Sequence, residues 1–456
     1  MNQFQNISPL DYRYRIADLE GFLTEEASIK YQIKVEVALV KTLSKFKVCS
    51  RAVYEEVKRK AVKVTASEVY REDKKTKHTV RALVNCIQKR VSKKARPFIH
   101  LGATSSDIYD TANAMRLWDA TQEVLIPDLL KFENQLIKLA RKERNTLQVG
   151  RTHGQHAVPI TFGFAIAEYV SRLGHTITEI VRANKNLRGK LSGAVGAYNA
   201  LNLAVSNPER FEEDVLNELG LRASTHSTQI VEPEYLVNHT HALTVAFGVL
   251  ANFVRDMRHL QRTEIAEIGE GFAKEQVGSS TMPHKRNPVT FEHVEGLWKE
   301  LMPRMITLYL DQVSEHQRDL SNYSSGRFVF EVLHGLTAGV RRLNKVMEKF
   351  AVDREKMKAN FKMSQKMIIA EPLYVLLALS GHPDAHEAVR KLTLAAEKSS
   401  EGIVSLLSRD PKLRQYFQKI PKDKRKILEQ PELYVGKASQ KTEKVCKFWE
   451  KQLKNF

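Results

Sequence analysis

The sequence predicts an all-α protein with several helical domains. The chain has 456 residues, which is enough for about three domains of ~150 residues each. Glycine and proline together make up 35 residues, about 8% of the chain, against ~12% in an average protein. That shortage disfavours a turn-rich β fold. Long stretches without these two residues carry apolar side chains at helical spacing, which predicts long helices.

One long stretch follows Pro233 and has no further proline before Pro283. Its apolar residues alternate at steps of three and four, a period near 3.5 that is typical of long helices in a bundle. The stripe consists of Leu236, Leu243, Phe247, Leu250, Val254 and Met257. Similar stripes predict helices over residues 161–187 and 294–308. A fourth helix, over residues 111–144, is predicted to be interrupted or kinked near Pro127.

Such long helices need apolar partners along their whole length, and a central bundle supplies them, from this chain or from other subunits. The first ~105 and last ~100 residues have more breaks, as at Gly381-His382-Pro383. We therefore expect three domains: an N-terminal helical domain (1–105), a central long-helix bundle (106–350) and a C-terminal helical domain (351–456).

The charge is strongly positive, with a formal net value of +19. Residues 41–100 hold 18 Lys and Arg against 5 Asp and Glu, and residues 401–456 hold 14 against 7. A basic surface attracts anions. These segments lack interleaved aromatic pairs, zinc-ligand spacing and RNA-binding motifs, so nucleic-acid binding is disfavoured.

Cysteine usage and hydropathy point to a cytoplasmic protein. Cys49, Cys86 and Cys446 form neither a disulfide framework nor a metal-ligand pattern. The sequence has no run of 18 apolar residues and no signal-peptide pattern at its start. We expect no membrane partner.

Three segments of small and polar residues interrupt the helical pattern. They are HLGATSSDIYDT (100–111), GRTHGQHAVP (150–159) and GSSTMPHKRNP (278–288). Loops on a rigid scaffold are where binding and catalysis concentrate. The third segment offers hydroxyl, amide and cationic donors that suit a carboxylate or phosphate. The same residues also fit an ordinary basic surface loop.

The other two segments have both chemical and structural interpretations. His153 and His156 are able to move a proton near neutral pH, although a single histidine more often has a structural role. Thr104, Ser105 and Asp107 read as a helix N-cap, whose hydroxyl and N–H groups are also available to an anion. Capping alone explains them.

Together the three segments resemble the fumarase/aspartase superfamily, whose signature is similar to GSSTMPHKRNP. Within it, the sequence is most similar to the adenylosuccinate lyase family. The matching motifs are SPLDYRY (8–14), HLGATSSDIYDTAN (100–113), GRTHGQHAVP (150–159), STQI (227–230), LQRTEIAE (260–267) and QRDLSN (317–322). The resemblance implies a homotetramer with a shared central bundle, active sites built from three subunits, and no metal or organic cofactor.

The resemblance also implies a reaction and residue roles. The reaction is β-elimination of fumarate from adenylosuccinate, giving AMP, and from the succinylcarboxamide ribotide SAICAR, giving AICAR. Ser279 would be the base and His153 the acid, aided by His78. Substrate contacts would come from Arg13, Tyr14, Thr104, Ser105, Gln229, Ser280, Lys285, Asn287, Arg318, Ser324 and Arg327.

The sequence departs from the family pattern in two places. Thr79 follows His78 where an aspartate is usual. Tyr323 stands where a serine is usual, five residues after Arg318. Neither change removes a proton-transfer group, so we expect activity with altered affinity at the phosphate end of the site.

Two alternatives stay open. A sister enzyme such as argininosuccinate lyase, aspartase or a cycloisomerase would share the fold and signature loop, because substrate choice lies outside both. A non-catalytic helical scaffold that binds nucleic acid is the second, and the +19 charge motivates it.

Overall fold

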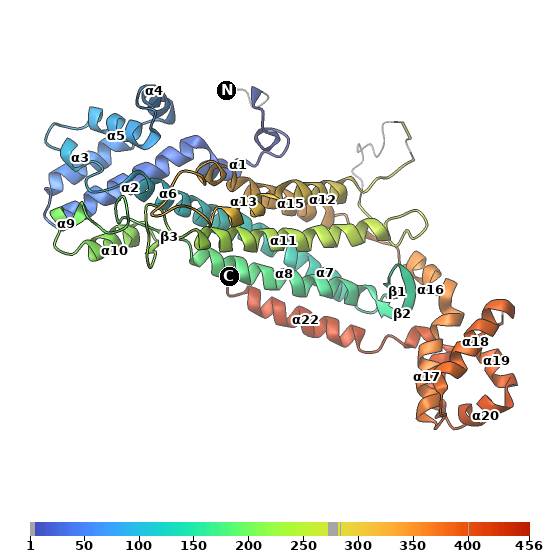
Figure 1. Ribbon diagram of the computed structural model, residues 1–456. Coiled ribbons are helices and arrows are strands. Elements are labelled where there is room, and N and C mark those ends of the chain that lie inside the picture. Colours follow the sequence, from blue (N-terminus) through green and yellow to red (C-terminus); the bar gives the residue numbers. More distant parts are fainter. Residues whose placement is uncertain (1–4, 272–280, 283, 400) are drawn as a thin grey trace. The chain divides into compact units, whose positions relative to one another are not determined.

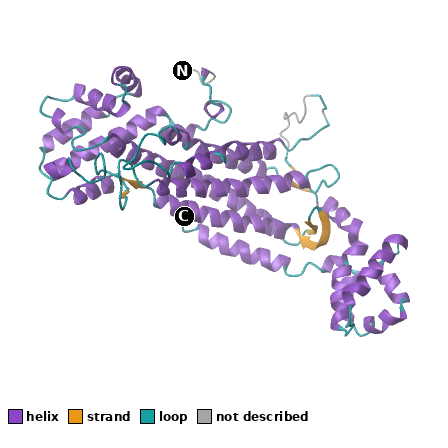
Figure 2. Ribbon diagram, in the orientation of Figure 1, coloured by secondary structure: helices purple, strands orange, loops and turns teal. Residues whose placement is uncertain are grey.

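The computed structural model describes residues 5–271, 281–282, 284–399 and 401–456, and these residues are mainly helical (Figures 1 and 2). The prediction of an all-α fold is confirmed. Three two-stranded sheets accompany the described helices: antiparallel β1 (Leu147–Thr152) and β2 (Gln155–Thr161), parallel β3 (Arg188–Gly189) and β4 (Arg222–Ala223), and antiparallel β5 (Ile268–Gly269) and β6 (Ala351–Val352). Among the described helices, none has the length and hydropathy needed to cross a bilayer.

The chain forms two compact units, each assembled from three separate stretches. Unit 1 contains Met1–Leu130, His175–Ala251 and His293–Arg342, and unit 2 contains Lys131–Gly174, Asn252–Glu292 and Leu343–Phe456. Five helices contribute residues to both units: α7 (Ile126–Lys142), α8 (Phe162–Lys185), α11 (Pro233–Leu260), α12 (Val289–Leu301) and α15 (Phe330–Met347).

Unit 1 begins with a packed set of helices. These are α1 (Ala17–Leu23), α2 (Glu25–Lys45), α3 (Arg51–Ala61), α4 (Ala66–Thr76), α5 (Thr79–Arg90) and α6 (Ser105–Ala120), with short 3₁₀ turns at Pro9–Asp11 and Arg96–Phe98. Leu39, Leu43 and Leu83 are among the fully buried residues of their shared core. Side chains of Thr24, Ser50 and Thr65 cap the starts of α2, α3 and α4, because each accepts a backbone N–H that the first helical turn leaves unpaired.

The remaining helices of unit 1 are α9 (Leu201–Ala204), α10 (Pro208–Glu218), α13 (Arg304–Leu310), α14 (Ser325–Phe328) and parts of the shared helices. The predicted stripe of α11 is buried at Leu243, Phe247 and Leu250. The stripe over 294–308 is also buried, but two helices carry it instead of one. They separate before Pro303, which has no N–H to continue a helical ladder.

Near the predicted irregularity at Pro127, the structure has a π-helical turn over Thr121–Leu125, which joins α6 to α7. Helix α6 begins at Ser105, six residues before the predicted start of this helix. The extra residue of a π turn releases one rung of the helical ladder, which accommodates the proline that follows.

Unit 2 contains the β1–β2 hairpin and a cluster of shorter helices. They are α16 (Arg354–Ile368), α17 (Ala370–Leu379), α18 (Ala385–Ser399), α19 (Ile403–Arg409), α20 (Pro411–Phe417), α21 (Lys422–Glu429) and α22 (Ala438–Leu453), with a 3₁₀ turn at Pro431–Leu433. Leu373, Leu377, Ile403 and Leu407 are fully buried in one core of this unit. Trp449 of α22 is buried as well and packs on Gly174 of α8.

This close approach predicts a large effect of Gly174→Ala. A Cβ at position 174 would lie 2.3–2.8 Å from indole atoms of Trp449, so the ring or α22 must move. We expect the free energy of unfolding to fall by about 1–3 kcal/mol, although alanine favours a helix more than glycine does. Calorimetric or urea midpoints measure the effect.

The matched control is Gly21→Ala in α1, where an added Cβ has no neighbour within 4 Å. That variant should keep or raise the midpoint. An unchanged midpoint for Gly174→Ala would contradict the packing of Trp449 described above.

Candidate active site

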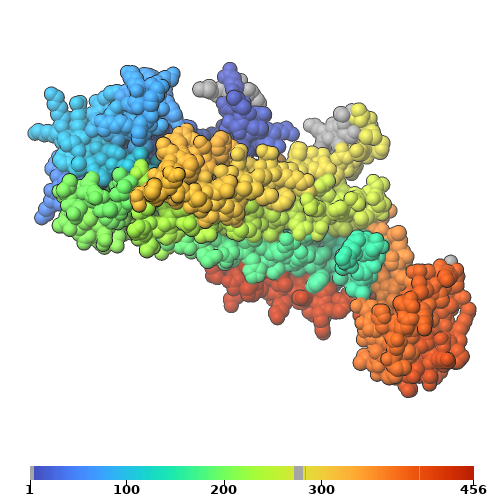
Figure 3. Space-filling view, in the orientation of Figure 1, coloured from blue at the N-terminus to red at the C-terminus, as the bar shows by residue number. Residues whose placement is uncertain are grey.

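Unit 1 contains a cavity of about 780 Å³. Its walls come from α2, α4, α5 and α6 and from two segments, residues 229–237 and 308–329. In the space-filling view, the orange surface around residues 310–330 adjoins the green surface of residues 200–240 (Figure 3). Segments that are far apart in sequence therefore meet around one space.

Helix α6 supplies one polar face of the cavity. Ser105, Ser106, Tyr109, Asp110 and Asn113 all line it, and their spacing of three and four residues places them on one side of the helix. The predicted N-cap is confirmed: the backbone N–H of Thr104 donates to Asp107 Oδ2 at 2.7 Å. The cap fixes where the first turn of α6 meets the cavity.

His78 lines the cavity from the start of α5. Its Nδ1 accepts a hydrogen bond from the backbone N–H of Arg81 at 3.2 Å, so the histidine is itself the helix cap. An accepting Nδ1 carries no proton, so the proton of a neutral ring resides on Nε2. Thr79 also lines the cavity, at the position where the family pattern has an aspartate.

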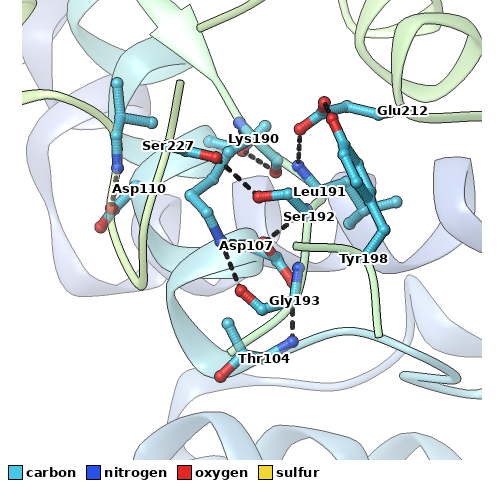
Figure 4. A network of polar contacts seen from close by, with 12 residues as sticks. Thr104, Asp107, Asp110, Lys190, Leu191, Ser192, Gly193, Tyr198, Glu212 and Ser227 are labelled. Carbon is cyan, nitrogen blue, oxygen red and sulfur yellow. Dashed lines mark hydrogen bonds and ion pairs between the residues drawn. The ribbon is translucent and has the colours of Figure 1, made fainter. Parts of the chain in front are cut away.

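Two hydrogen bonds hold the segment that carries Gln229. The backbone N–H of Gln229 donates to the carbonyl of Gln317 at 3.1 Å, and the backbone N–H of Val231 donates to Asp110 Oδ2 at 3.2 Å (Figure 4). Gln229 and Arg318 both line the cavity. The structure thus brings these two predicted residues together with the α6 face.

Arg327 is a second cation in the cavity wall, surrounded by tyrosines. Its Nη2 donates to the Tyr323 hydroxyl at 2.9 Å, and its guanidinium carbon lies 4.9 Å from the centre of that ring. The Tyr109 ring centre lies 6.0 Å from that of Tyr323. Among the described residues, no carboxylate pairs with Arg327. Its charge therefore remains available to an anion.

Asp110 is the most perturbed acid in the cavity wall. Burial raises its pKa to about 7, and the negative charge of nearby Asp107 adds to the rise. The positive charges of Lys190 and Arg318 and the hydrogen bond from Val231 lower the pKa, but only in part. The carboxyl therefore keeps its proton at pH values where an exposed aspartate has lost it.

Four other predicted contacts lie in unit 1 but do not line the cavity: Arg13, Tyr14, Thr104 and Ser324. Arg13 and Ser324 are exposed. The Tyr14 ring packs 4.9 Å from the guanidinium carbon of Arg342, and its carbonyl lies 2.8 Å from His334 Nε2. Thr104 contributes the cap that precedes Ser105.

In unit 2, His153 lies at the tip of the β1–β2 hairpin. His153 and Gly154 both have positive φ, 54° and 74°, as a two-residue type I′ turn requires. The His153 side chain is exposed. His156 differs: it is half-buried, and its Nδ1 lies 2.7 Å from the Ser364 hydroxyl.

A buried carboxylate holds the first strand of this hairpin. Glu267 is fully buried, pairs with Arg151 and accepts from the side-chain amides of Gln148 at 2.8 Å and Asn360 at 2.9 Å. Each carboxylate oxygen has at least one donor, which compensates for its removal from water. His153 is therefore presented by a backbone that its neighbours fix.

Ser279 and Ser280 lie outside the described residues, as do the other residues of 272–280. The following part of the signature segment belongs to unit 2. Lys285 is exposed, and its backbone N–H donates to the carbonyl of Met282 at 3.0 Å. Asn287 is half-buried just before α12, and its carbonyl accepts from Val289.

Sequence reasoning did not single out Tyr70, Tyr109, Asp110 and Arg188 as cavity residues. For Tyr109 and Asp110 a signal was present, because they follow Ser105 and Ser106 by one helical turn on the same face. Tyr70 and Arg188 come from other parts of the chain, and only the tertiary structure brings them to the cavity.

Comparisons with known proteins give the family. Residues 3–302 match the lyase family model, and residues 314–431 match the model of the adenylosuccinate lyase C-terminal region. The chain is 32% identical to adenylosuccinate lyase of Pyrococcus horikoshii over 97% of this chain and 98% of that one, and 30% identical to that of Archaeoglobus fulgidus over 98% and 100%. The chain belongs to the adenylosuccinate lyase family of the fumarase/aspartase superfamily.

Solved structures are similar in fold. The 3-carboxy-cis,cis-muconate lactonizing enzyme of Pseudomonas putida aligns with a TM-score of 0.83 at 23% identity over 97% of this chain and 99% of that one. A fumarate lyase of Mesorhizobium sp. BNC1 aligns with a TM-score of 0.82 at 19% identity over 95% and 98%. These likenesses support the helical lyase fold.

The raised pKa of Asp110 predicts a pH-dependent stability difference. The unfolded chain loses this proton near pH 4 and the folded chain near pH 7, so Asp110 lowers the free energy of unfolding as pH rises through this interval. In Asp110→Asn the amide oxygen still accepts from Val231, and the proton loss is gone. The variant should therefore gain thermal stability over wild type more at pH 8 than at pH 5.

Asp319→Asn is the matched control, because hydrogen bonds from Ser321 lower the pKa of Asp319 and both pH values lie above it. Its effect should be equal at pH 5 and pH 8. Equal effects of Asp110→Asn at the two pH values would refute a proton held by Asp110.

Proposed function

We propose that this protein cleaves adenylosuccinate to AMP and fumarate, and SAICAR to AICAR and fumarate, as an enzyme of purine synthesis. The observation that carries the proposal is similarity to curated adenylosuccinate lyases at 30–32% identity over nearly the whole chain. The cavity of unit 1 supports it, because predicted site residues from four separate segments line one space.

The reaction is a β-elimination that needs a base and an acid. The base removes a proton from the carbon beside a carboxylate, and the electron pair forms the double bond of fumarate as the C–N bond breaks. The acid protonates the leaving nitrogen. We assign Ser279 as the base and His153 as the acid. The exposed position of His153 on a fixed hairpin supports its role as a proton donor.

The remaining residues would bind substrate. Lys285 and Asn287 would stabilise the extra charge that develops on the carboxylate. Gln229 and Ser105 would contact the succinyl and nucleotide parts, and His78 would aid the acid. Arg318 and Arg327 would hold oxyanions. Further contacts are assigned to Arg13, Tyr14, Thr104, Ser280 and Ser324.

We also propose a homotetramer whose active sites each collect residues from three subunits. The described residues that line the cavity all belong to unit 1, and neither His153 nor the described signature residues 281–282 and 284–288 are among them. In the tetramer, copies of these residues from other subunits would complete the site. The buried, unpaired cysteines support a cytoplasmic location, because they suit a reducing compartment.

The alternative of a sister enzyme has weaker support. The cycloisomerase of Acinetobacter calcoaceticus aligns with a TM-score of 0.79 at 24% identity, a likeness of fold alone. Fold is shared across many reactions, so it does not select a substrate.

The assay is turnover of adenylosuccinate and SAICAR, followed as stoichiometric release of fumarate. Wild type should convert both. His153→Ala and Ser279→Ala should each lower kcat by about 10²–10⁴-fold, the usual contribution of general acid–base catalysis. Both variants should keep the mass of the wild-type assembly in analytical ultracentrifugation. Loss of assembly would mean that these residues are structural.

Mixing variants separates the shared-site proposal from the chemistry. Subunits of His153→Ala and Ser279→Ala, dissociated and reassembled together, should regain part of the activity, because some sites then receive both intact residues. An inert mixture from two correctly assembled variants would contradict shared sites. No turnover by wild type would contradict the proposed function.

The contacts of Tyr323 predict a role in binding the phosphate of adenylosuccinate. Its hydroxyl accepts from Arg327, which leaves its own proton free to donate to an anion beside that arginine. Tyr323→Phe should raise the KM for adenylosuccinate about 10-fold, the loss expected for a hydrogen bond to a charged group. It should hardly change the KM for succinyladenosine, which lacks the phosphate.

Tyr323→Ser is the informative second variant, since it restores the residue type usual in the family. Its KM for adenylosuccinate should lie closer to wild type than that of Tyr323→Phe. Equal penalties for the phosphorylated and dephosphorylated substrates would remove Tyr323 from the phosphate site.

A further inference from the structure

A buried lysine in unit 1 has no part in the chemistry described so far. Lys190 is fully buried, and its Nζ pairs with the fully buried carboxylate of Asp107. The same Nζ donates to the carbonyl of Gly193 at 3.2 Å. Neither Lys190 nor Asp107 lines the cavity, so the pair acts on a substrate only through other residues.

Both oxygens of Asp107 accept hydrogen bonds, from two segments of the chain (Figure 4). Oδ2 accepts from the backbone N–H groups of Thr104 at 2.7 Å and Gly193 at 3.1 Å. Oδ1 accepts from the backbone N–H of Ser192 at 3.1 Å as well as from Lys190. The first turn of α6 and the segment 190–193 are therefore joined through one carboxylate.

The backbone of Lys190 is held by α6 as well. The Thr111 hydroxyl donates to the Lys190 carbonyl and accepts from the Lys190 N–H, both at 3.0 Å. Arg188, two residues earlier, lines the cavity. The position of this lysine thus determines where the Arg188 segment meets α6.

The chain of contacts continues to Gln229. The Ser192 and Ser227 hydroxyls lie 2.6 Å apart (Figure 4). A Cβ on Gly196 would lie 2.0 Å from the Ser227 carbonyl oxygen, so the two backbones touch and glycine is required there. Gln229 follows Ser227 by two residues, and its neighbour Val231 is bound to Asp110 of α6.

Stability alone does not explain a buried ion pair. Removing two charges from water costs about as much as their attraction returns, and apolar pairs of similar volume are often as stable. The pair instead fixes the geometry of the chain. Four donors from two segments, the start of α6 and residues 190–193, converge on Asp107, and the charge of Lys190 neutralises the carboxylate that accepts them.

We propose that Lys190 and Asp107 are positioning residues for the reaction, which hold Ser105, Arg188 and Gln229 in register around the substrate. This inference rests on the proposed function. It adds two residues to the catalytic apparatus that touch neither the substrate nor the reacting atoms.

The test is a double-mutant cycle with Asp107→Asn and Lys190→Met. Each single variant should be strongly destabilised, because it leaves the partner charge buried and unpaired. The double variant should recover most of the lost unfolding midpoint. Its kcat/KM should nevertheless stay about 10- to 100-fold below that of wild type, mainly because KM rises. Displacement of groups that bind the substrate has effects of this size. A double variant with wild-type stability and wild-type KM would overturn the proposal.

A milder variant keeps the proposal testable if these variants do not fold. Ser227→Ala removes the link from Ser192 to the Gln229 segment and leaves the ion pair intact. It should raise KM about 3- to 10-fold, the loss expected for one neutral hydrogen bond, without lowering kcat.

The matched control is Glu212→Gln. Glu212 binds the N–H of Leu191 and the Tyr198 hydroxyl in the same network (Figure 4) but does not line the cavity. Its KM should stay at the wild-type value, and a KM unchanged in Ser227→Ala would also overturn the proposal.

A ligand-free measurement separates this inference from the proposed function. If wild type turns over neither substrate, the proposed function fails, and amide hydrogen exchange decides the positioning role. Backbone amides of residues 227–231 should exchange faster in Ser227→Ala than in Glu212→Gln. Equal exchange rates in the two variants would overturn the inference even in an active enzyme.

Discussion

Charge buried away from water has to be neutralised and hydrogen-bonded, and in unit 1 this demand falls on Asp107 and Lys190. Both side chains are fully buried, so the chain around them has to bring every donor to its place. The backbone N–H groups of Thr104, Ser192 and Gly193 do so. The first turn of α6 and the segments that follow it in the cavity wall take their positions from this one requirement.

Unit 2 meets the same demand with a different residue. Glu267 is fully buried and receives donors from β1 and α16, and the strand that it holds leads directly to His153. In both units, a buried carboxylate therefore fixes a backbone, and that backbone presents the polar side chains assigned to substrate. Rigid support of this kind lets an exposed histidine or a helix start keep a defined direction, which catalysis requires.

The two departures from the family pattern, Thr79 and Tyr323, both line the cavity. Tyr323 adds a ring and a hydroxyl to the wall and orients Arg327. With Thr79, no carboxylate directly follows His78, and Nδ1 of this histidine caps α5. We expect both changes to alter the affinity for anions and to leave the proposed proton-transfer residues unaffected.

The sequence by itself determined the helical class, the buried stripes of α11 and α12–α13, the cap at the start of α6 and the family. These are local or periodic properties, which short stretches of side chains carry directly. It also singled out Ser105, Gln229 and Arg318, which lie in motifs, and His78 and Arg327, which match single positions of the family pattern. Only the tertiary structure decided that these five residues share one cavity, that Tyr70, Tyr109 and Asp110 join them, and that Lys190 is buried against Asp107. Lys190 and Asp107, for example, are 83 positions apart in the sequence. No pattern along the chain encodes which distant segment satisfies a buried charge.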